Sequence, residues 1–360
     1  MRQPRVRLYA LALAGLLILC GVRIAMVMSY AANILPLGGD ANAYIAAARA
    51  IVHGQTPVGT QGAQFLPEVR GGIPPYLYPP FLALMLVPLA SLPYPTALYL
   101  WLALVVATTV FLIAVLRPCV GWPVAVIGVL FFLPTWESLW LGQINALIAV
   151  LIATMLRMID QRHAGRLGVV IAFGTLLKIT PVLAVLILVS QRRWRSIWSA
   201  LLTLIGVVIL SLPLVSLDAW YGGALSALRN TDVSPLFLSW TAILRSQPGL
   251  VGVIGPPVII LSMVAITALR GRCISFRLGL TAASLLPLLI SGIIWHYTAI
   301  LALPALAVLW QHNLRARLIA LTTWVVISLI GGIGQPIMLS LCWCMCCWPH
   351  LLGPHESDHV

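Results

Sequence analysis

Residues 2–28 read RQPRVRLYALALAGLLILCGVRIAMVM, in which three arginines precede an almost unbroken apolar run. The run is long enough to cross a bilayer as one helix, which needs about 20 apolar residues. Positive charge just before such a run is typical of an N-terminus on the cytoplasmic side. A cleavable signal peptide shares this layout, but Arg23 interrupts the run and no clear small-residue cleavage site follows. We therefore predict a first transmembrane helix, followed by a first extracytoplasmic loop at residues 29–94.

The whole chain has the same character. Of its 360 residues, 61% are apolar and only 8% are charged, and the mean hydropathy is +1.04. A soluble domain is about 45–50% apolar and about 25% charged. This composition excludes a soluble globular protein, a coiled coil and a disordered chain, and the continuous apolar runs do not fit a membrane β-barrel. The predicted fold is an all-α polytopic membrane protein.

Arginine clusters predict which loops face the cytoplasm. The net charge is +13, and 20 of the 21 basic residues are arginines. In a membrane protein such arginines hold loops on the cytoplasmic face, so we expect no nucleic-acid partner. If all the downstream clusters are cytoplasmic, each interval between them contains an even number of crossings, which predicts about 10–12 transmembrane helices. The clusters lie at positions 117, 157/162/166, 192/193/195, 270/272/277 and 315/317.

The first outer loop contains two segments that we expect to lie along the membrane. Residues 40–53 are good helix formers between two glycines, too short and too charged to span. Residues 54–78 are rich in glycine, proline and glutamine and read as loop. Residues 79–92 are apolar but bracketed by prolines, and a stretch this short is interfacial or re-entrant more often than spanning.

Four ionisable residues fall at the outer ends of predicted helices, namely Asp40, Glu137, Lys178 and His296. Ionisable groups at membrane depth are costly and usually face a cavity or a partner. We therefore predict that a carboxylate, an ammonium and an imidazole converge in one pocket that opens away from the cytosol.

Each of these residues also has an ordinary structural interpretation. Asp40 follows two glycines and can cap a helix, or it can act as a general base. Lys178, the only lysine, precedes a helix-breaking Pro181; it is either a snorkelling anchor or a compact charge that contacts a phosphate. His296 can simply bond a backbone carbonyl, while Tyr297 fits an interfacial aromatic belt.

Several specific motifs are missing from the sequence. It contains no P-loop, no dinucleotide fingerprint, no HExxH and no DxD-type carboxylate pair. We therefore predict no cofactor and no metal site. Four cysteines near the C-terminus lack metal-site spacing and are expected to pack in an apolar helix, with a lipid anchor as the alternative: Cys342, Cys344, Cys346 and Cys347.

Six motifs in order resemble the glycosyltransferase family 87, over roughly residues 8–310. They are Gly39-Asp40 with Tyr44, Tyr78-Pro79-Pro80, Leu141-Gly142-Gln143-Ile144-Asn145, Leu177-Lys178-Ile179-Thr180-Pro181, Arg192-Arg193-Trp194-Arg195, and Trp295-His296-Tyr297 with Pro304. The chain departs from the family in a longer loop after Gly54 and in His296-Tyr297, where relatives often carry two histidines. The donor sugar and the acceptor are therefore left open.

The resemblance implies a GT-C-like helical bundle with its active site on the extracytoplasmic side of the plasma membrane. We predict one transmembrane glycosyltransferase domain over residues 1–335, followed by a cysteine-rich apolar segment and polar tail at 336–360, where the resemblance does not extend. By resemblance, Asp40 is the catalytic base, and Lys178 and His296 contact the donor phosphate. The candidate substrate-binding residues are Tyr44, Tyr78, Glu137, Gln143, Asn145 and Tyr297.

The implied reaction transfers a hexose, with mannose as the first candidate, from a polyprenyl-phosphate donor to an acceptor hydroxyl with inversion. The acceptor is a glycolipid, a polysaccharide or another molecule. The alternative is a transporter or flippase of a lipid-linked or polar solute, since broken helices and an intramembrane lysine also fit such proteins. Transporters usually show two related halves, and we find no convincing repeat between residues 1–180 and 181–360.

Overall fold

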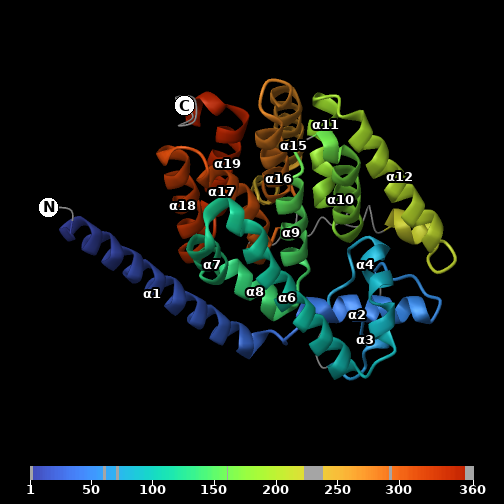
Figure 1. Ribbon diagram of the computed structural model, residues 1–360. Coiled ribbons are helices and arrows are strands. Elements are labelled where there is room, and N and C mark those ends of the chain that lie inside the picture. Colours follow the sequence, from blue (N-terminus) through green and yellow to red (C-terminus); the bar gives the residue numbers. More distant parts are fainter. Residues whose placement is uncertain are drawn as a thin grey trace.

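The computed structural model describes residues 3–59, 62–69, 73–159, 161–222, 238–291 and 294–352, and within these ranges it is helical with no strand. The predicted all-α fold class is confirmed. Figure 1 shows a bundle of the later helices, with α1 along one side. Helices α2, α3 and α4 lie below the bundle in this view. The polar C-terminal tail predicted after residue 352 lies outside the described residues.

Four helices are long and apolar enough to cross a membrane on their own: α1 (Gln3–Ile34), α6 (Tyr94–Val120), α12 (Trp194–Ser211) and α15 (Leu250–Gly271). A fifth span is formed if α7 (Trp122–Leu130) and α8 (Leu133–Leu141), which meet at a bend of 58°, count as one. The protein is therefore polytopic. The predicted 10–12 spans include shorter helices, and that number stays a prediction.

The remaining helices are shorter, and several of them are largely buried within the bundle. They include α9 (Asn145–Met155), α10 (Ala164–Leu177), η2 (Thr180–Leu183) with α11 (Ala184–Ser190), α16 (Phe276–Ile290), η3 (His296–Ala302) with α17 (Leu303–Trp310), α18 (Leu314–Leu329) and α19 (Gly334–Cys347). Almost every side chain of α16 is buried, whereas α1 exposes leucines and isoleucines along its length. Long exposed apolar helices around short buried ones match a protein surrounded by lipid.

The breaks between helices fall where the sequence predicted them. Gly142 ends α8 in a left-handed conformation with φ of 69°, and α9 begins at Asn145. Lys178 is extended and ends α10, and Pro181 stands in the first turn of η2, where its missing N–H costs nothing. The predicted divisions at 137–145 and 178–181 are confirmed.

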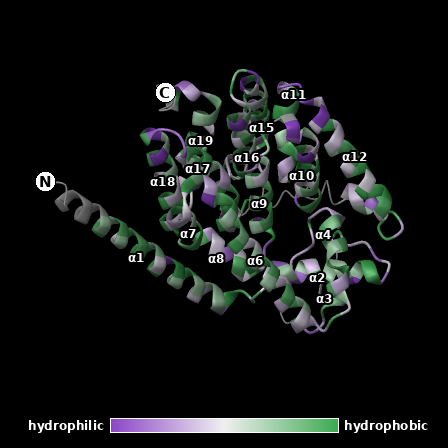
Figure 2. Ribbon diagram, in the orientation of Figure 1, coloured by the Kyte–Doolittle hydropathy of each residue, from purple (hydrophilic) through white to green (hydrophobic). Residues whose placement is uncertain are grey.

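The arginines concentrate at one end of the bundle, called here the arginine end. We define it by the turns that join α11 to α12, α15 to α16 and α17 to α18. Arg192 and Arg272 lie in the first two of these turns, and Arg315 lies at the start of α18, directly after the third. In Figure 2, hydrophilic segments gather at these turns, at the top of the view, while α2, α3 and α4 lie at the opposite end. These three of the five predicted clusters lie toward the same end, and their cytoplasmic location stays a prediction.

The first outer loop folds into short helices at the other end. Here α2 (Gly39–Val52) packs against α3 (Gly62–Phe65), α4 (Pro80–Met85) and α5 (Val87–Ala90). The helix predicted at 40–53 is confirmed, although its residues from Ala41 to Ala48 are buried rather than spread on a surface. The apolar segment predicted at 79–92 forms two short helices split at Leu86, as expected for a segment that does not cross.

Helix α19 closes the bundle beside α16 and α18. Cys342, Cys346 and Cys347 are buried in this packing, and all seven cysteines are free thiols. The expectation that these cysteines pack within an apolar helix is confirmed.

Candidate functional site

The start of α2 lies directly against the turn between α8 and α9. The amide of Gly38 donates to the carbonyl of Trp140 at 2.8 Å, and Trp101 Nε1 of α6 donates to the carbonyl of Gly142 at 2.7 Å. Gly142 has a positive φ, and a Cβ at this position would lie 2.7 Å from the Cβ of Ala41. Glycine is therefore required here on two grounds, conformation and space. This close approach brings Gln143 next to Asp40.

Gln143 is the centre of a hydrogen-bonded cluster. Its Nε2 donates to Oδ2 of Asp40 and to the hydroxyl of Tyr297 at 3.3 Å. Its Oε1 accepts from the hydroxyls of Tyr44 at 3.0 Å and Tyr78 at 3.3 Å. The buried amide of Gln143 thus connects α2, the loop before α4, and η3. All four of its partners come from distant parts of the chain.

Asp40 lies half-buried in the first turn of α2, but it is not the helix cap. The N-cap is Gly38, and no side chain caps this helix, so the capping interpretation of Asp40 is wrong. Burial raises the pKa of the Asp40 carboxyl, while hydrogen bonds from Gln143 and Tyr297 and the charge of Lys178 act in the opposite direction. A carboxylate with a raised pKa is a stronger base than an exposed one, provided that it is ionised.

Lys178 stands at the broken end of α10. Its Nζ donates to Oδ1 of Asn145 at 2.8 Å and lies 5.8 Å from the ring centroid of Tyr78. It is close enough to Asp40 for the two charges to interact, yet no ion pair joins them in the described part of the chain. One polar atom of its partner, Asn145 Nδ2, is buried without a hydrogen-bond partner. Buried polar atoms of this kind normally bind something, so this region has donors to offer a ligand.

Aromatic rings enclose the cluster on the side of the outer loop. The ring of Tyr44 meets those of Tyr76, Tyr78 and Trp101 edge-on at centroid distances of 6.3, 5.3 and 5.7 Å. Burial and the charge of Asp40 raise the pKa of Tyr78 to about 12. The phenol therefore stays protonated and can donate a hydrogen bond.

The sequence analysis did not identify two residues of this aromatic enclosure, Tyr76 and Trp101. The hydroxyl of Tyr76 donates to the carbonyl of Pro79 at 2.6 Å and accepts from the amide of Ala83 at 3.2 Å, which fastens the loop to α4. Trp101 looks like any other aromatic residue of a membrane helix. Only its bond to Gly142, 41 positions away, distinguishes it.

Glu137 and His296 form a second pair. Nδ1 of His296 lies 2.7 Å from Oε2 of Glu137, and its Nε2 lies 2.8 Å from the carbonyl oxygen of Ile327. Because a carbonyl can only accept, Nε2 carries a proton, and both ring nitrogens are in use. The pair thus links α8, η3 and α18. The role predicted for His296 at the donor phosphate stays a prediction; the structure gives the imidazole partners within the protein.

Of the predicted site residues, the structure brings most into one place. Asp40, Tyr44, Tyr78, Gln143 and Tyr297 share hydrogen bonds, and the Lys178–Asn145 pair lies beside them. The hydrogen bonds of His296 and Glu137 in the described residues are with each other and with Ile327. No three or more His, Cys, Asp or Glu side chains in the described ranges are grouped so that they could hold a metal ion.

A polytopic helical membrane protein with a carboxylate and a lysine at the outer-loop end of its bundle is the class that fold and site define. The profile of glycosyltransferase family 87 matches residues 76–277, more than half of the chain. The chain therefore belongs to glycosyltransferase family 87, as the sequence motifs predicted. No curated protein and no solved structure matches it.

Family membership establishes that the chain is a glycosyltransferase, with a sugar donor and an acceptor as substrates. It also favours the enzyme over the transporter that the sequence left as the alternative. The matched region contains Gln143, Asn145 and Lys178, but Asp40 and Tyr297 lie outside it. The case for Asp40 therefore depends on its place in the hydrogen-bonded cluster.

Proposed function

We propose that this glycosyltransferase moves a hexose, with mannose as the first candidate, from a polyprenyl-phosphate donor to an acceptor hydroxyl on the extracytoplasmic side of the plasma membrane. The acceptor is a glycolipid, a polysaccharide or another hydroxyl-bearing molecule. The observation that carries the proposal is the Asp40 carboxylate, fixed by Gln143 beside the charge of Lys178. Both lie in a protein whose apolar helices can admit a lipid-linked substrate.

In the proposed reaction Asp40 is the general base. It removes the proton from the acceptor hydroxyl while that oxygen attacks the anomeric carbon of the donor. The bond between the anomeric carbon and the phosphate oxygen breaks, and its electron pair leaves with the lipid phosphate. A single carboxylate without a second nucleophile supports direct displacement with inversion. Base assistance of this kind typically contributes about 10²–10⁴-fold in rate.

Lys178 is the proposed contact for the leaving phosphate. Its ammonium is a compact charge, and the unpartnered Nδ2 of Asn145 adds an uncharged donor beside it. Such donors stabilise the charge that gathers on the phosphate as the bond breaks. The proposal assigns the positive charge to Lys178 and uses no metal or other cofactor.

The side of the membrane is proposed from the arginines. Loops rich in arginine stay on the cytoplasmic face, and the Asp40 cluster lies at the end of the bundle opposite to the arginine end. A cysteine placed at Gln55, in the exposed outer loop, should react with a membrane-impermeant maleimide added to intact cells. Labelling of that cysteine only after lysis would reverse the proposed topology.

The base is tested by Asp40→Asn in membranes that contain a radiolabelled polyprenyl-phosphate hexose. We expect transfer to fall by at least about 10²-fold, since the amide cannot accept the proton. The matched control is Asp218→Asn, because Asp218 is an exposed carboxylate away from the cluster. Normal transfer by Asp40→Asn would remove Asp40 from the role of base.

The Asp40→Asn protein is expected to accumulate normally. The pKa of Asp40 is raised in the folded protein, so the folded state holds its proton more tightly than the unfolded chain does. This group therefore stabilises the fold at low pH, and that contribution is lost as the pH rises through the folded-state pKa. At neutral pH the neutral asparagine should give a melting temperature equal to or above that of the wild type.

A further inference from the structure

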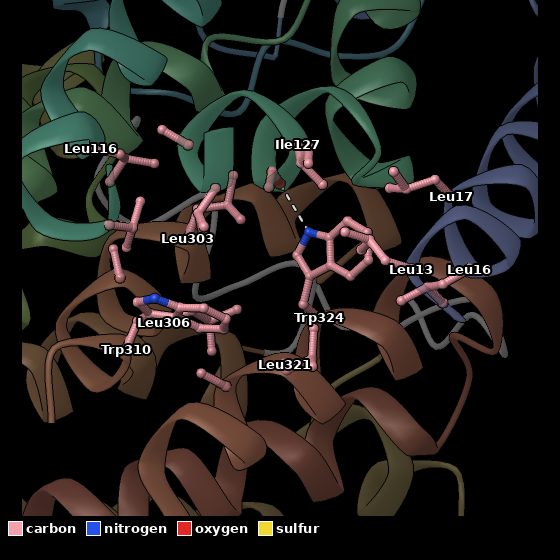
Figure 3. A pocket seen from close by; sticks show the side chains of 16 residues that line it. Leu13, Leu16, Leu17, Leu116, Ile127, Leu303, Leu306, Trp310, Leu321 and Trp324 are labelled. Atoms are coloured by element: carbon pink, nitrogen blue, oxygen red, sulfur yellow. Dashed lines mark hydrogen bonds between the residues drawn. The ribbon is translucent and has the colours of Figure 1, made fainter. Parts of the chain in front are cut away.

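An apolar cavity opens between α1 and the bundle, far from the Asp40 cluster. Its volume is about 330 Å³, and Figure 3 shows leucines and two tryptophans, Trp310 and Trp324, around it. The lining side chains come from α1, α6, α7, α17 and α18 and are almost all aliphatic or aromatic.

The cavity lies in the half of the bundle that faces the arginine end. It is lined by Leu116 and Val120 from the last turns of α6, by Trp310 at the end of α17, and by Ala320 and Trp324 from the middle of α18. Arginines lie close to these segments, at Arg117 in α6 and Arg315 in α18. With the topology proposed above, the cavity would lie in the membrane leaflet opposite to the proposed active site.

Lipid can reach this cavity. Leu13 and Leu321 line it, and their side chains are 47% and 39% exposed at the outer surface. Because an exposed apolar side chain in this part of a membrane protein faces lipid, the cavity communicates with the hydrocarbon of one leaflet.

Two arginines contact the chain at residues 310 and 311, where the last residue of α17 lines the cavity. Nη2 of Arg277 contacts Oε1 of Gln311 and lies 3.8 Å from Sγ of Cys119. Nε of Arg317 donates to the carbonyl of Trp310 at 3.0 Å. Trp310 lines the cavity, and Gln311 and Cys119 are chain neighbours of lining residues.

Among the described residues, no carboxylate neutralises these two guanidinium groups. Nε of Arg277 is buried without a hydrogen-bond partner, and neither arginine is in a salt bridge within the described residues. An apolar cavity with two such arginines beside its lining at Trp310 complements a molecule with a hydrocarbon chain and an anionic head.

We propose that this cavity binds one acyl chain of an anionic glycerophospholipid, with the lipid phosphate on Arg277 and Arg317. The volume of about 330 Å³ is roughly eleven times the ~30 Å³ that one water occupies, and a methylene is of similar size. The cavity therefore holds most of one fatty-acyl chain. This is a lipid-binding site separate from the proposed donor site, and its test does not depend on transfer activity.

Native mass spectrometry of the delipidated full-length protein in detergent tests the head group. We expect one tightly bound phosphatidylglycerol, and clearly weaker binding of phosphatidylcholine with the same acyl chains. Arg277→Gln and Arg317→Gln should each weaken phosphatidylglycerol binding about fivefold, as expected for one basic residue against an anionic lipid. The control is Arg315→Gln, since residue 315 lies about 200° around α18 from residue 317. Equal binding of the two lipids would overturn the proposal.

Gly128→Leu tests the apolar part of the site. Gly128 lines the cavity, and a Cβ at this position would meet no atom within 4 Å. Leucine also has the higher helix propensity, so the variant is expected to fold. Gly206→Leu in α12 is the matched control, since its Cβ is equally unhindered and it lies outside the cavity.

We expect at least a tenfold loss of phosphatidylglycerol binding in Gly128→Leu and none in Gly206→Leu, with both variants monodisperse by size exclusion. Unchanged binding in Gly128→Leu would show that the acyl chain lies elsewhere. Competition arms add polyprenyl phosphate or glycerol phosphate. Displacement of the lipid by polyprenyl phosphate at equal concentration would assign the cavity to the isoprenoid substrate and overturn the phospholipid proposal. Displacement by glycerol phosphate alone would show that the cavity does not contribute to binding.

Discussion

Gln143→Leu is the substitution that most directly tests the cluster around Asp40. Leucine is close to glutamine in size but removes both the Nε2 donor to Asp40 and the Oε1 acceptor for Tyr44 and Tyr78. If Asp40 is the base, losing this donor changes its ionisation as well as the packing around it.

The expected shift can be worked out from the contacts. A hydrogen bond to a charged group stabilises it by about 1.5–3 kcal/mol, and one pKa unit corresponds to about 1.4 kcal/mol. Burial already raises the pKa of Asp40, and the bond from Gln143 opposes that effect. Without this bond, the ionised carboxylate should lose stabilisation of about 1.5–3 kcal/mol, so the pKa of Asp40 should rise further. A base works only when ionised, so the acid limb of kcat/KM against pH should move to higher pH.

The assay is sugar transfer from a defined lipid donor, measured across the acid limb for wild type and variant. Asn42→Leu is the matched control, since Asn42 in α2 also has a buried side-chain amide, and its Oδ1 accepts from the hydroxyl of Tyr94 at 2.8 Å. Both variants should lower the melting temperature, but only Gln143→Leu should move the acid limb. An acid limb in Gln143→Leu that coincides with the wild type, or moves to lower pH, would refute the assignment of Asp40 and Gln143.

Other substitutions separate catalysis from structure. Lys178→Gln should reduce kcat/KM for the lipid donor about 10²-fold with little loss of stability, and Lys178→Arg should recover only part of it, which kinetics with a short-chain donor would measure. Glu137→Gln should weaken the link to His296 and lower the free energy of unfolding by about 1–3 kcal/mol, seen as a lower melting temperature. Trp101→Phe should cost a similar amount, because the buried carbonyl of Gly142 loses its donor.

Features of the fold that depend on local chemistry were predictable from the sequence. Apolar runs gave the membrane class, and glycine and proline marked the breaks at Gly142 and Pro181. The helix at the start of the outer loop runs over Gly39–Val52, within one residue of the predicted 40–53. These features depend on residues a few positions apart, where backbone preferences decide.

The contacts that form the site were not predictable in this way. Tyr44 and Gln143 are 99 positions apart, and Gln143 and Tyr297 are 154 positions apart. Gln143 looked like a polar residue at a helix start, and nothing local shows that its amide joins four partners. The engagement of His296 with the carbonyl of Ile327 in α18 depends on packing that no pattern in the sequence reveals.

The Asp40 cluster and the Glu137–His296 pair are connected through the chain. Glu137 lies on α8, the helix that leads into Gln143, and His296 immediately precedes Tyr297. The bond between Glu137 and His296 therefore fixes α8 relative to η3. Gln143, two positions after α8, and Tyr297, the second residue of η3, share a hydrogen bond beside Asp40. A buried ion pair adds little net stability after desolvation, but it specifies one arrangement of the helices that bear it. We infer that the Glu137–His296 pair positions the amide and the phenol that hold the base, and that its contribution to transfer acts through them.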